Sequence, residues 1–273
     1  MNRLFVAYKP SGLSSNQFLG RLKRKYGVKK AGYSGTLDPF AKGALIVAFG
    51  KYASLFRFLD KAPKTYRATL WLGAHSETLD IEKVDKIDDL APLPDEAVEA
   101  AVMSLAGELR YPPPIFSAKR VNGVRAYDLA REGKPVELET ITSTVYDVRL
   151  LHYRHPFVTF EATVSEGTYI RSLGRLTCER LGLGGGALSM LERLREGRFV
   201  FEDERPLDIR TVLAMPQNRY HGDRNALLLG QKLRRDDFEC TENGRYWVDN
   251  GESISVLAFD DEGVHYLLNK VPL

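Results

Sequence analysis

The feature that most constrains the fold is a set of strand-like stretches that follow one another without a helix between them. Residues 65–72 alternate, with Tyr66, Ala68 and Leu70 on one face, which predicts a half-buried β-strand. Residues 145–153 and 158–164 predict two further strands joined by a turn that contains Pro156. Since these strands are consecutive in the chain, the predicted fold class is α+β.

Other stretches predict helices and buried strands around this core. Residues 15–26 have apolar side chains at helical spacing, with Ser14 or Ser15 as the N-cap and Gly27 as the stop. Residues 95–105 and 169–181 read as two further helices, and residues 4–8 and 44–49 as apolar strands. We expect residues 32–43, rich in Gly, Ser, Thr and Pro, to form one loop before the second of these strands.

The end of the chain has a different character. Short β-like runs at residues 245–248, 254–259 and 264–268 are separated by Asn-Gly and Asp-rich turns. The glycines at 184–186 predict a flexible break earlier in the chain. A length of 273 residues suits one large domain with a small appendage. We therefore predict a catalytic domain over residues 1–221 and a small β module over residues 222–273.

The charge of the chain is unevenly distributed. The net charge is +3, yet the residues before Asp38 include eight lysines and arginines and no acidic residue. Clustered positive charge attracts phosphate groups, so a nucleic acid is a plausible partner, although a solvated helix face would have the same composition. Two distant cysteines, no signal peptide and no membrane-length apolar stretch lead us to expect a cytoplasmic protein.

Several kinds of chemistry have no motif in this sequence. The five histidines do not converge on a metal site at the predicted elements, and the phosphate-binding, dinucleotide and serine-hydrolase motifs are missing. What stands out is a carboxylate, Asp38, in the segment Gly35-Thr36-Leu37-Asp38-Pro39. A turn or N-cap aspartate is the ordinary interpretation. The alternative is a nucleophile that a nearby cation keeps ionised.

Five blocks of sequence decide between these interpretations. They occur in the order Lys9-Pro10-Ser11-Gly12, then residues 31–43 around Asp38, Lys64-Thr65-Tyr66-Arg67, residues 117–131 with Ser117 and Lys119, and Glu166-Gly167-Thr168-Tyr169-Ile170-Arg171. Together they resemble the bacterial tRNA pseudouridine synthases of the TruB family, which isomerise uridine 55 in the TΨC loop. A weaker likeness continues at Leu191-Glu192-Arg193.

The resemblance implies a fold, a reaction and a set of roles. The fold would be a mixed, largely antiparallel sheet flanked by helices, followed by a PUA-like RNA-binding module. Asp38, Tyr66 and Arg171 would be catalytic: Asp38 as the reactive carboxylate, Tyr66 stacked on the flipped uracil, and Arg171 paired with Asp38. Four further residues would support the loop or contact substrate, namely Lys9, Lys64, Tyr169 and Lys119.

One position departs from the family pattern. The family usually has Gly-His where this chain has Gly32-Tyr33. Tyr33 can still contact RNA, because aromatic faces stack on bases. The resemblance implies tRNA as the substrate, no metal, no cofactor and no obligatory protein partner, hence a monomer. Two alternatives stay open: a synthase for another RNA, and an RNA-binding or tRNA-folding module without catalysis.

Overall fold

The computed structural model describes residues 1–273 except 118, 122–123 and 133–137. Its centre is a nine-stranded sheet in the order β1-β3-β12-β4-β11-β10-β7, with β2 added to β3 and β13 added to β12. The strands are β1 (Arg3–Lys9), β2 (Ala31–Ser34), β3 (Lys42–Phe49), β4 (Lys64–Leu72), β7 (Gly107–Tyr111), β10 (Ile141–Arg154), β11 (Phe157–Val164), β12 (Gly186–Glu196) and β13 (Phe199–Val200).

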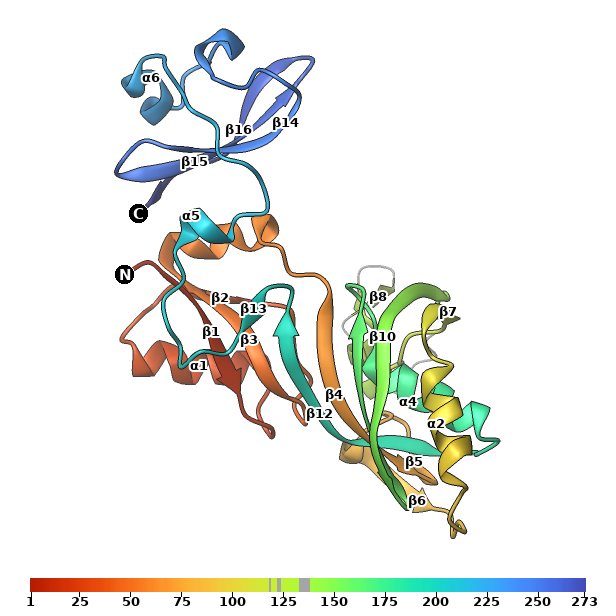
Figure 1. Cartoon of the computed structure of the whole chain (residues 1–273). Helices are drawn as coiled ribbons and strands as arrows, with labels where there is room; N and C mark the ends of the chain where they lie inside the picture. The colour runs from red at the N-terminus through yellow and green to blue at the C-terminus, as the bar shows by residue number, and fades with distance from the viewer. Residues whose placement is uncertain (118, 122–123, 133–137) are drawn as a thin grey trace.

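The sheet is antiparallel except where β12 meets β3. That parallel contact joins the two halves of the sheet (Figure 1). It brings Gly43 against the backbone of Arg193, where a Cβ atom would lie 2.2 Å from the Arg193 carbonyl oxygen. Only glycine allows the two backbones to approach this closely.

Helices cover the sheet in two places. Helix α1 (Ser15–Lys25) packs Phe18 and Leu22 against β1 and β3, and Ser14 caps it in a capping box with Gln17. Helices α2 (Asp95–Met103) and α4 (Ile170–Arg180) pack against β10, β4 and β12 on the other half of the sheet. The 3₁₀ helix η1 (Gly50–Phe58) follows β3.

Short elements complete the part of the chain that precedes the C-terminal sheet. They are β5 (Ala74–Ser76), η2 (Ile81–Lys83), β6 (Val84–Ile87), β8 (Arg120–Val121), β9 (Val124–Arg125), α3 (Ala126–Arg131) and α5 (Ile209–Val212). The segment between β5 and β6 carries Asp80, whose side chain is buried.

The C-terminal module is a separate three-stranded antiparallel sheet (Figure 1). Its elements are α6 (Arg224–Leu229), η3 (Arg235–Asp237), β14 (Gly244–Asp249), β15 (Ser253–Asp260) and β16 (Gly263–Pro272). One face has its own core around Phe238 and Phe259. The other face packs Trp247 and Ile254 against η1 and α5, so the module packs on the larger part of the chain.

The predicted α+β class and the small C-terminal β sheet are confirmed. Two local predictions are wrong. Of the predicted loop over residues 32–43, residues 32–34 belong to strand β2 and residues 42–43 to strand β3, because pairing between these two strands outweighs the weak strand propensity of glycine and serine. The glycines at 184–186 do not form a flexible break: the Gly185 carbonyl accepts a hydrogen bond from the Gly73 amide, and Gly186 begins the central strand β12.

Candidate active site

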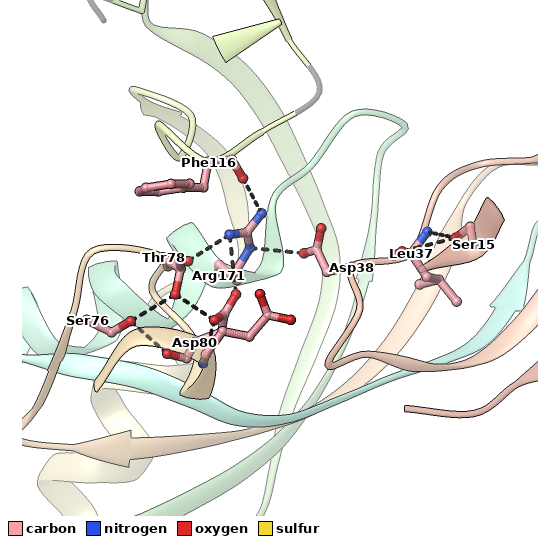
Figure 2. A network of polar contacts seen from close by, with 9 residues as sticks. Ser15, Leu37, Asp38, Ser76, Thr78, Asp80, Phe116 and Arg171 are labelled. Carbon is pink, nitrogen blue, oxygen red and sulfur yellow. Dashed lines mark hydrogen bonds and ion pairs between the residues drawn. The ribbon is translucent and has the colours of Figure 1, made fainter. Parts of the chain in front are cut away.

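The loop that carries Asp38 connects β2 to β3 and is held from below. Ser15 Oγ lies 3.0 Å from both the amide nitrogen and the carbonyl oxygen of Leu37 (Figure 2). The fully buried Lys9 donates from Nζ to the carbonyl oxygens of Pro10, Pro39 and Ala41 at 2.9, 3.3 and 2.7 Å. Side chains from outside the loop thus fix the backbone on both sides of Asp38.

A second anchor holds the beginning of the loop. Arg193 on β12 is buried, and it donates to the carbonyl oxygens of Gly35 at 2.9 Å and Ala44 at 2.8 Å. Its partner Glu196 is also buried, 3.3 Å away. Gly35 has a φ of +66°, and an added Cβ would lie 2.8 Å from Glu196 Oε1. Glycine therefore satisfies both the backbone conformation and the close approach.

Arg171 lies at the start of α4 and meets Asp38 at the mouth of the loop. Its Nε is 3.0 Å from Asp38 Oδ2. Its other donors reach the carbonyl oxygens of Thr78 at 2.7 Å and Phe116 at 2.8 Å, and Asp80 Oδ2 at 3.4 Å (Figure 2). The side chain is 5 % exposed. A guanidinium fixed on several sides can hold a carboxylate in one orientation.

Asp80 is the second carboxylate on Arg171, and its environment is closed. Its Oδ1 accepts from Thr78 Oγ1 at 2.6 Å and from the Glu82 amide at 3.0 Å. Ser76 Oγ donates to the Asp80 carbonyl at 2.7 Å. Figure 2 shows Arg171 between this network and Asp38. Asp80 is buried and paired with Arg171, and is thus placed to position this guanidinium.

Two pKa shifts follow from this geometry. Burial raises the pKa of Asp38 above its ordinary value of 3.8, Asp80 adds to the rise, and Arg171 and Lys9 oppose it. Although 37 % of the Asp38 side chain is accessible, protein surrounds the carboxylate closely enough for desolvation to dominate. Burial also lowers the pKa of Lys9 to about 8, against a partial offset from the charges of Asp38 and Glu82.

Asp38 and Arg171 open onto a cavity of about 340 Å³. Tyr66 and Tyr169 line it together with Lys64. Tyr66 is 8 % exposed and packs in the main core with Leu37 and Ile170. The structure thereby collects the three predicted catalytic residues and two of the predicted substrate-binding residues at one cavity. Residues from four distant blocks of the sequence meet there.

Three predicted site residues lie elsewhere. Tyr33 is on β2, where its hydroxyl donates to Asn16 Oδ1 at 3.2 Å, and it does not line the cavity. Lys119 does not line it either; its carbonyl accepts from the Ala126 amide at 2.7 Å. Lys9 lies beneath the loop and is fully buried, so in this structure it contacts the loop backbone and not the cavity.

Sequence reasoning missed several residues of the site. Ser15 was a candidate helix cap, but Ser14 caps α1 and Ser15 instead holds Leu37. Arg193 gave only a weak family signal, and Glu196 gave none. Their function depends on the parallel contact between β12 and β3, which no local pattern encodes. A buried charge pair leaves no periodic trace in a sequence.

The larger hollow of the protein lies away from this chemistry. It measures about 780 Å³ and separates the end of α1 and the start of η1 from β16. Lys29, Lys30 and Lys51 line it, and its described lining residues include no acidic side chain. Because it lacks a reactive group, we assign the chemistry to the smaller cavity and consider the hollow as a binding surface.

The described residues offer no group of three or more His, Cys, Asp or Glu side chains that could hold a metal ion. Over the same part of the chain, none of the helices has the length and apolar character needed to cross a bilayer.

Comparison with known proteins identifies the class. Residues 23–170 match the family model described as "TruB family pseudouridylate synthase (N terminal domain)". A relative in Sulfurimonas denitrificans named tRNA pseudouridine synthase B is 56 % identical over 99 % of both chains. A second, from a Sulfurovum species, has the same name and is 54 % identical over all of this chain and 98 % of its own. The chain belongs to the TruB family of pseudouridylate synthases and is an isomerase.

Solved structures show the same fold. A Cbf5-Nop10-Gar1 complex includes a chain similar to this one with a TM-score of 0.66 and 20 % identity, over 98 % of this chain and 84 % of that chain. A chain in an H/ACA RNP bound to a substrate RNA containing 2′-deoxyuridine has a TM-score of 0.62 at 20 % identity, over 99 % of this chain and 85 % of its own. At this identity the likeness extends to the fold alone.

Proposed function

We propose that this protein isomerises uridine 55 in the TΨC loop of tRNA to pseudouridine. The observation that carries the proposal is the Asp38–Arg171 pair at a cavity walled by Tyr66. The names of the full-length relatives support tRNA as the substrate. The position in the TΨC loop rests on the resemblance of the motifs around these residues to the family pattern.

The reaction assigns a task to each of these residues. The N1–C1′ bond of uridine breaks, the uracil rotates, and a C5–C1′ bond forms; C5 loses a proton and N1 gains one. The base must leave its stack first, at a cost of a few kcal/mol. Stacking on an aromatic ring such as Tyr66 returns about 1–3 kcal/mol per base. Because no atom or electron is gained overall, we expect the reaction to need no cofactor.

Asp38 is the group we assign to the bond exchange. An ionised carboxylate can add to C6 of the base, attack C1′ of the sugar, or remove a proton on a glycal route. Arg171 favours the charged form of Asp38 and fixes its orientation, while Lys9 and Ser15 fix the loop. All three routes use the same carboxylate, so all three predict loss of activity in Asp38→Asn.

The lysine-lined hollow beside β16 supports a role for the C-terminal module in holding RNA. Lys51 Nζ donates to the Lys270 carbonyl at 3.1 Å, which ties the module to the catalytic domain at this hollow. Lys29 and Lys30 are exposed at its edge. Exposed lysines without a carboxylate among their lining neighbours suit a phosphate backbone. We assign this surface to tRNA outside the target loop.

The direct experiment uses the purified protein and an unmodified tRNA transcript, with no cofactor added. Pseudouridine is then mapped at nucleotide resolution. We expect one new pseudouridine, at position 55. Product at a different tRNA position would refute the assignment of the TΨC loop, and no product in any tRNA would refute tRNA as the substrate.

Two other functions make different predictions. A synthase for another RNA would form no pseudouridine in tRNA. A strain without this protein would then lose pseudouridine only in another RNA, for example at a site in ribosomal RNA. An RNA-binding or tRNA-folding module would bind tRNA but form no product. The Asp38–Arg171 contact favours catalysis, since binding alone does not need a carboxylate opposed to an anionic ligand.

A further inference from the structure

Lys64 holds an unusual position at the active-site cavity. It begins β4 next to Tyr66, and its side chain is 10 % exposed. Its Nζ lies 3.5 Å from Glu196 Oε1 and 3.6 Å from Glu166 Oε1. Within the part of the chain that the structure describes, both contacts are ion pairs without hydrogen-bond geometry. Lys64 is therefore a buried ammonium group that the described carboxylates hold through ion pairs.

The other two cations at the cavity are already committed. Arg171 donates to two backbone carbonyls and faces two carboxylates. Arg193 donates to the carbonyls of Gly35 and Ala44 and pairs with Glu196. Among the lining residues that the structure describes, Lys64 is thus the cation with donors left for a ligand.

The two carboxylates on Lys64 differ sharply. Glu196 is fully buried and shared with Arg193, so it cannot leave. Glu166 is 62 % exposed, at the mouth of the cavity, and precedes Gly167, around which an added Cβ would have open space. The cluster of Lys64, Arg193, Glu196 and Glu166 carries no net charge. When Glu166 turns away, one positive charge remains and faces the cavity.

We propose that Glu166 is a resident counter-ion that an RNA phosphate displaces from Lys64. The inference rests on the proposed function only in that the ligand is RNA. A nucleotide whose base reaches Tyr66 leaves its sugar and phosphate at the mouth, where Glu166 now lies against Lys64. Glu166 repels that phosphate and occupies Lys64, the cation that would otherwise pair with the phosphate. The residue thereby weakens binding of RNA and lets the product leave.

The test is the dissociation constant for an unmodified tRNA transcript, measured with wild type and Glu166→Gln. The variant should bind about two- to fivefold more tightly, the fold-change that a partly exposed ion pair supplies. The difference should shrink as salt is added, because exposed charges are screened. Unchanged or weaker binding by Glu166→Gln at low salt would overturn the proposal.

Two further variants separate this effect from general surface charge. Glu179→Gln is the matched control: Glu179 lies on α4, is 52 % exposed and does not line the cavity. It should leave the dissociation constant within error of wild type. In a Lys64→Gln background, Glu166→Gln should lose most of its effect. Equal tightening by the Glu166 and Glu179 variants would refute the displacement, even if Lys64→Gln fails to fold.

The outcome of this binding test can be distinguished from the outcome of the pseudouridine assay that tests the proposed function. Tighter binding by Glu166→Gln with no pseudouridine in tRNA would retain the displacement and refute the proposed reaction. Pseudouridine at position 55 with no change in binding would do the reverse. Failure of wild type and variant alike to bind tRNA would refute both.

Discussion

Arg171 contacts two carboxylates, Asp38 and Asp80, which lie in two different environments. On one side, Asp38 contacts the guanidinium through one oxygen, is 37 % exposed and faces the cavity. On the other side, Asp80 is 3 % exposed and accepts from Thr78, the Glu82 amide and Arg171. An aspartate is thus partly exposed and ion-paired with Arg171 in one region, and buried with several hydrogen bonds in the other.

The difference teaches how the site separates reactivity from support. A buried carboxylate whose oxygens already accept several hydrogen bonds is suited to hold Arg171 in position. An open carboxylate with one cationic partner keeps a free oxygen for chemistry. Arg171 couples the two, because the network around Asp80 sets the position from which Arg171 meets Asp38. The two regions should therefore respond differently to substitution.

The largest combined effect on stability and activity is expected when both regions lose their common partner. Arg171→Met leaves Asp38 and Asp80 without their guanidinium and vacates two carbonyls. We expect a stability loss of about 3–5 kcal/mol, the usual cost of breaking a buried ion pair. Pseudouridine formation should fall by about 10³-fold or more. Urea denaturation and single-turnover assays measure the two; a variant as active as wild type would refute the coupling.

Asp80→Asn removes charge from the closed region alone. It should cost about 1.5–3 kcal/mol of stability, the range for hydrogen bonds to charged groups. The single-turnover rate should fall by roughly 10- to 100-fold, because Arg171 loses one of its supports. Loss of the Asp80 charge also lowers the pKa of Asp38, so the acid limb of the rate profile should move to lower pH. An unshifted limb would argue that Asp38 does not set it.

The pH dependence of Lys9 tests the support of the open region. With a pKa of about 8, Lys9 loses its charge above neutrality and holds the loop carbonyls less tightly. The rate should then fall, by up to about tenfold at pH 9, where one tenth of a group with that pKa is protonated. Rates measured from pH 7 to 10 with saturating tRNA give the limb; a flat profile contradicts this role.

Stability should respond to Lys9 in the opposite direction. The folded-state pKa is lower than the value of 10.5 expected for the unfolded chain, so between pH 8 and 10.5 the unfolded chain binds more protons. The contribution of Lys9 to stability therefore rises with pH across this window. Comparison with Lys9→Met isolates it. A parallel fall of rate and of this contribution would indicate partial unfolding instead.

The smallest effect is expected far from both carboxylates. Lys29→Ser combined with Lys30→Ser should weaken tRNA binding by about three- to fivefold and lower the slope of log K against log salt by about 2. The rate at saturating tRNA should not change. Lys232→Ser, at an exposed lysine outside the hollow, is the control. Equal losses in both variants would mean that the hollow is not a specific surface.

Much of the architecture could be predicted because it is periodic. The alternation around Tyr66 and the helical spacing around Phe18 gave β4 and α1 nearly to the residue. Strand β2 and the central position of β12 could not be predicted in this way. Strand β2 is only four residues long, and β12 directly follows two glycines; pairing of β2 with β3, and of β12 with both β3 and β4, forms these strands.

The residues of the site also divide into those that could be predicted from the sequence and those that could not. Asp38, Tyr66 and Arg171 lie in motifs and could be named from the sequence. Asp80 contacts Arg171 and Arg193 contacts Gly35, across 91 and 158 residues of sequence. Glu196 acts through its ion pair with Arg193. Tyr33, where the family has histidine, was predicted to contact substrate, and the structure places it outside the cavity. Its role stays a prediction.

The central claim is that Asp38 performs the chemistry while the rest of the site holds it in place. The most direct measurement compares wild type and Asp38→Asn in single-turnover pseudouridine formation, with saturating protein and unmodified tRNA, beside the dissociation constant of each. We predict that the rate falls by about 10²- to 10⁴-fold, the contribution of a positioned acid, base or nucleophile. The dissociation constant for tRNA should stay within about twofold of the wild-type value. Wild-type turnover by Asp38→Asn would contradict the account.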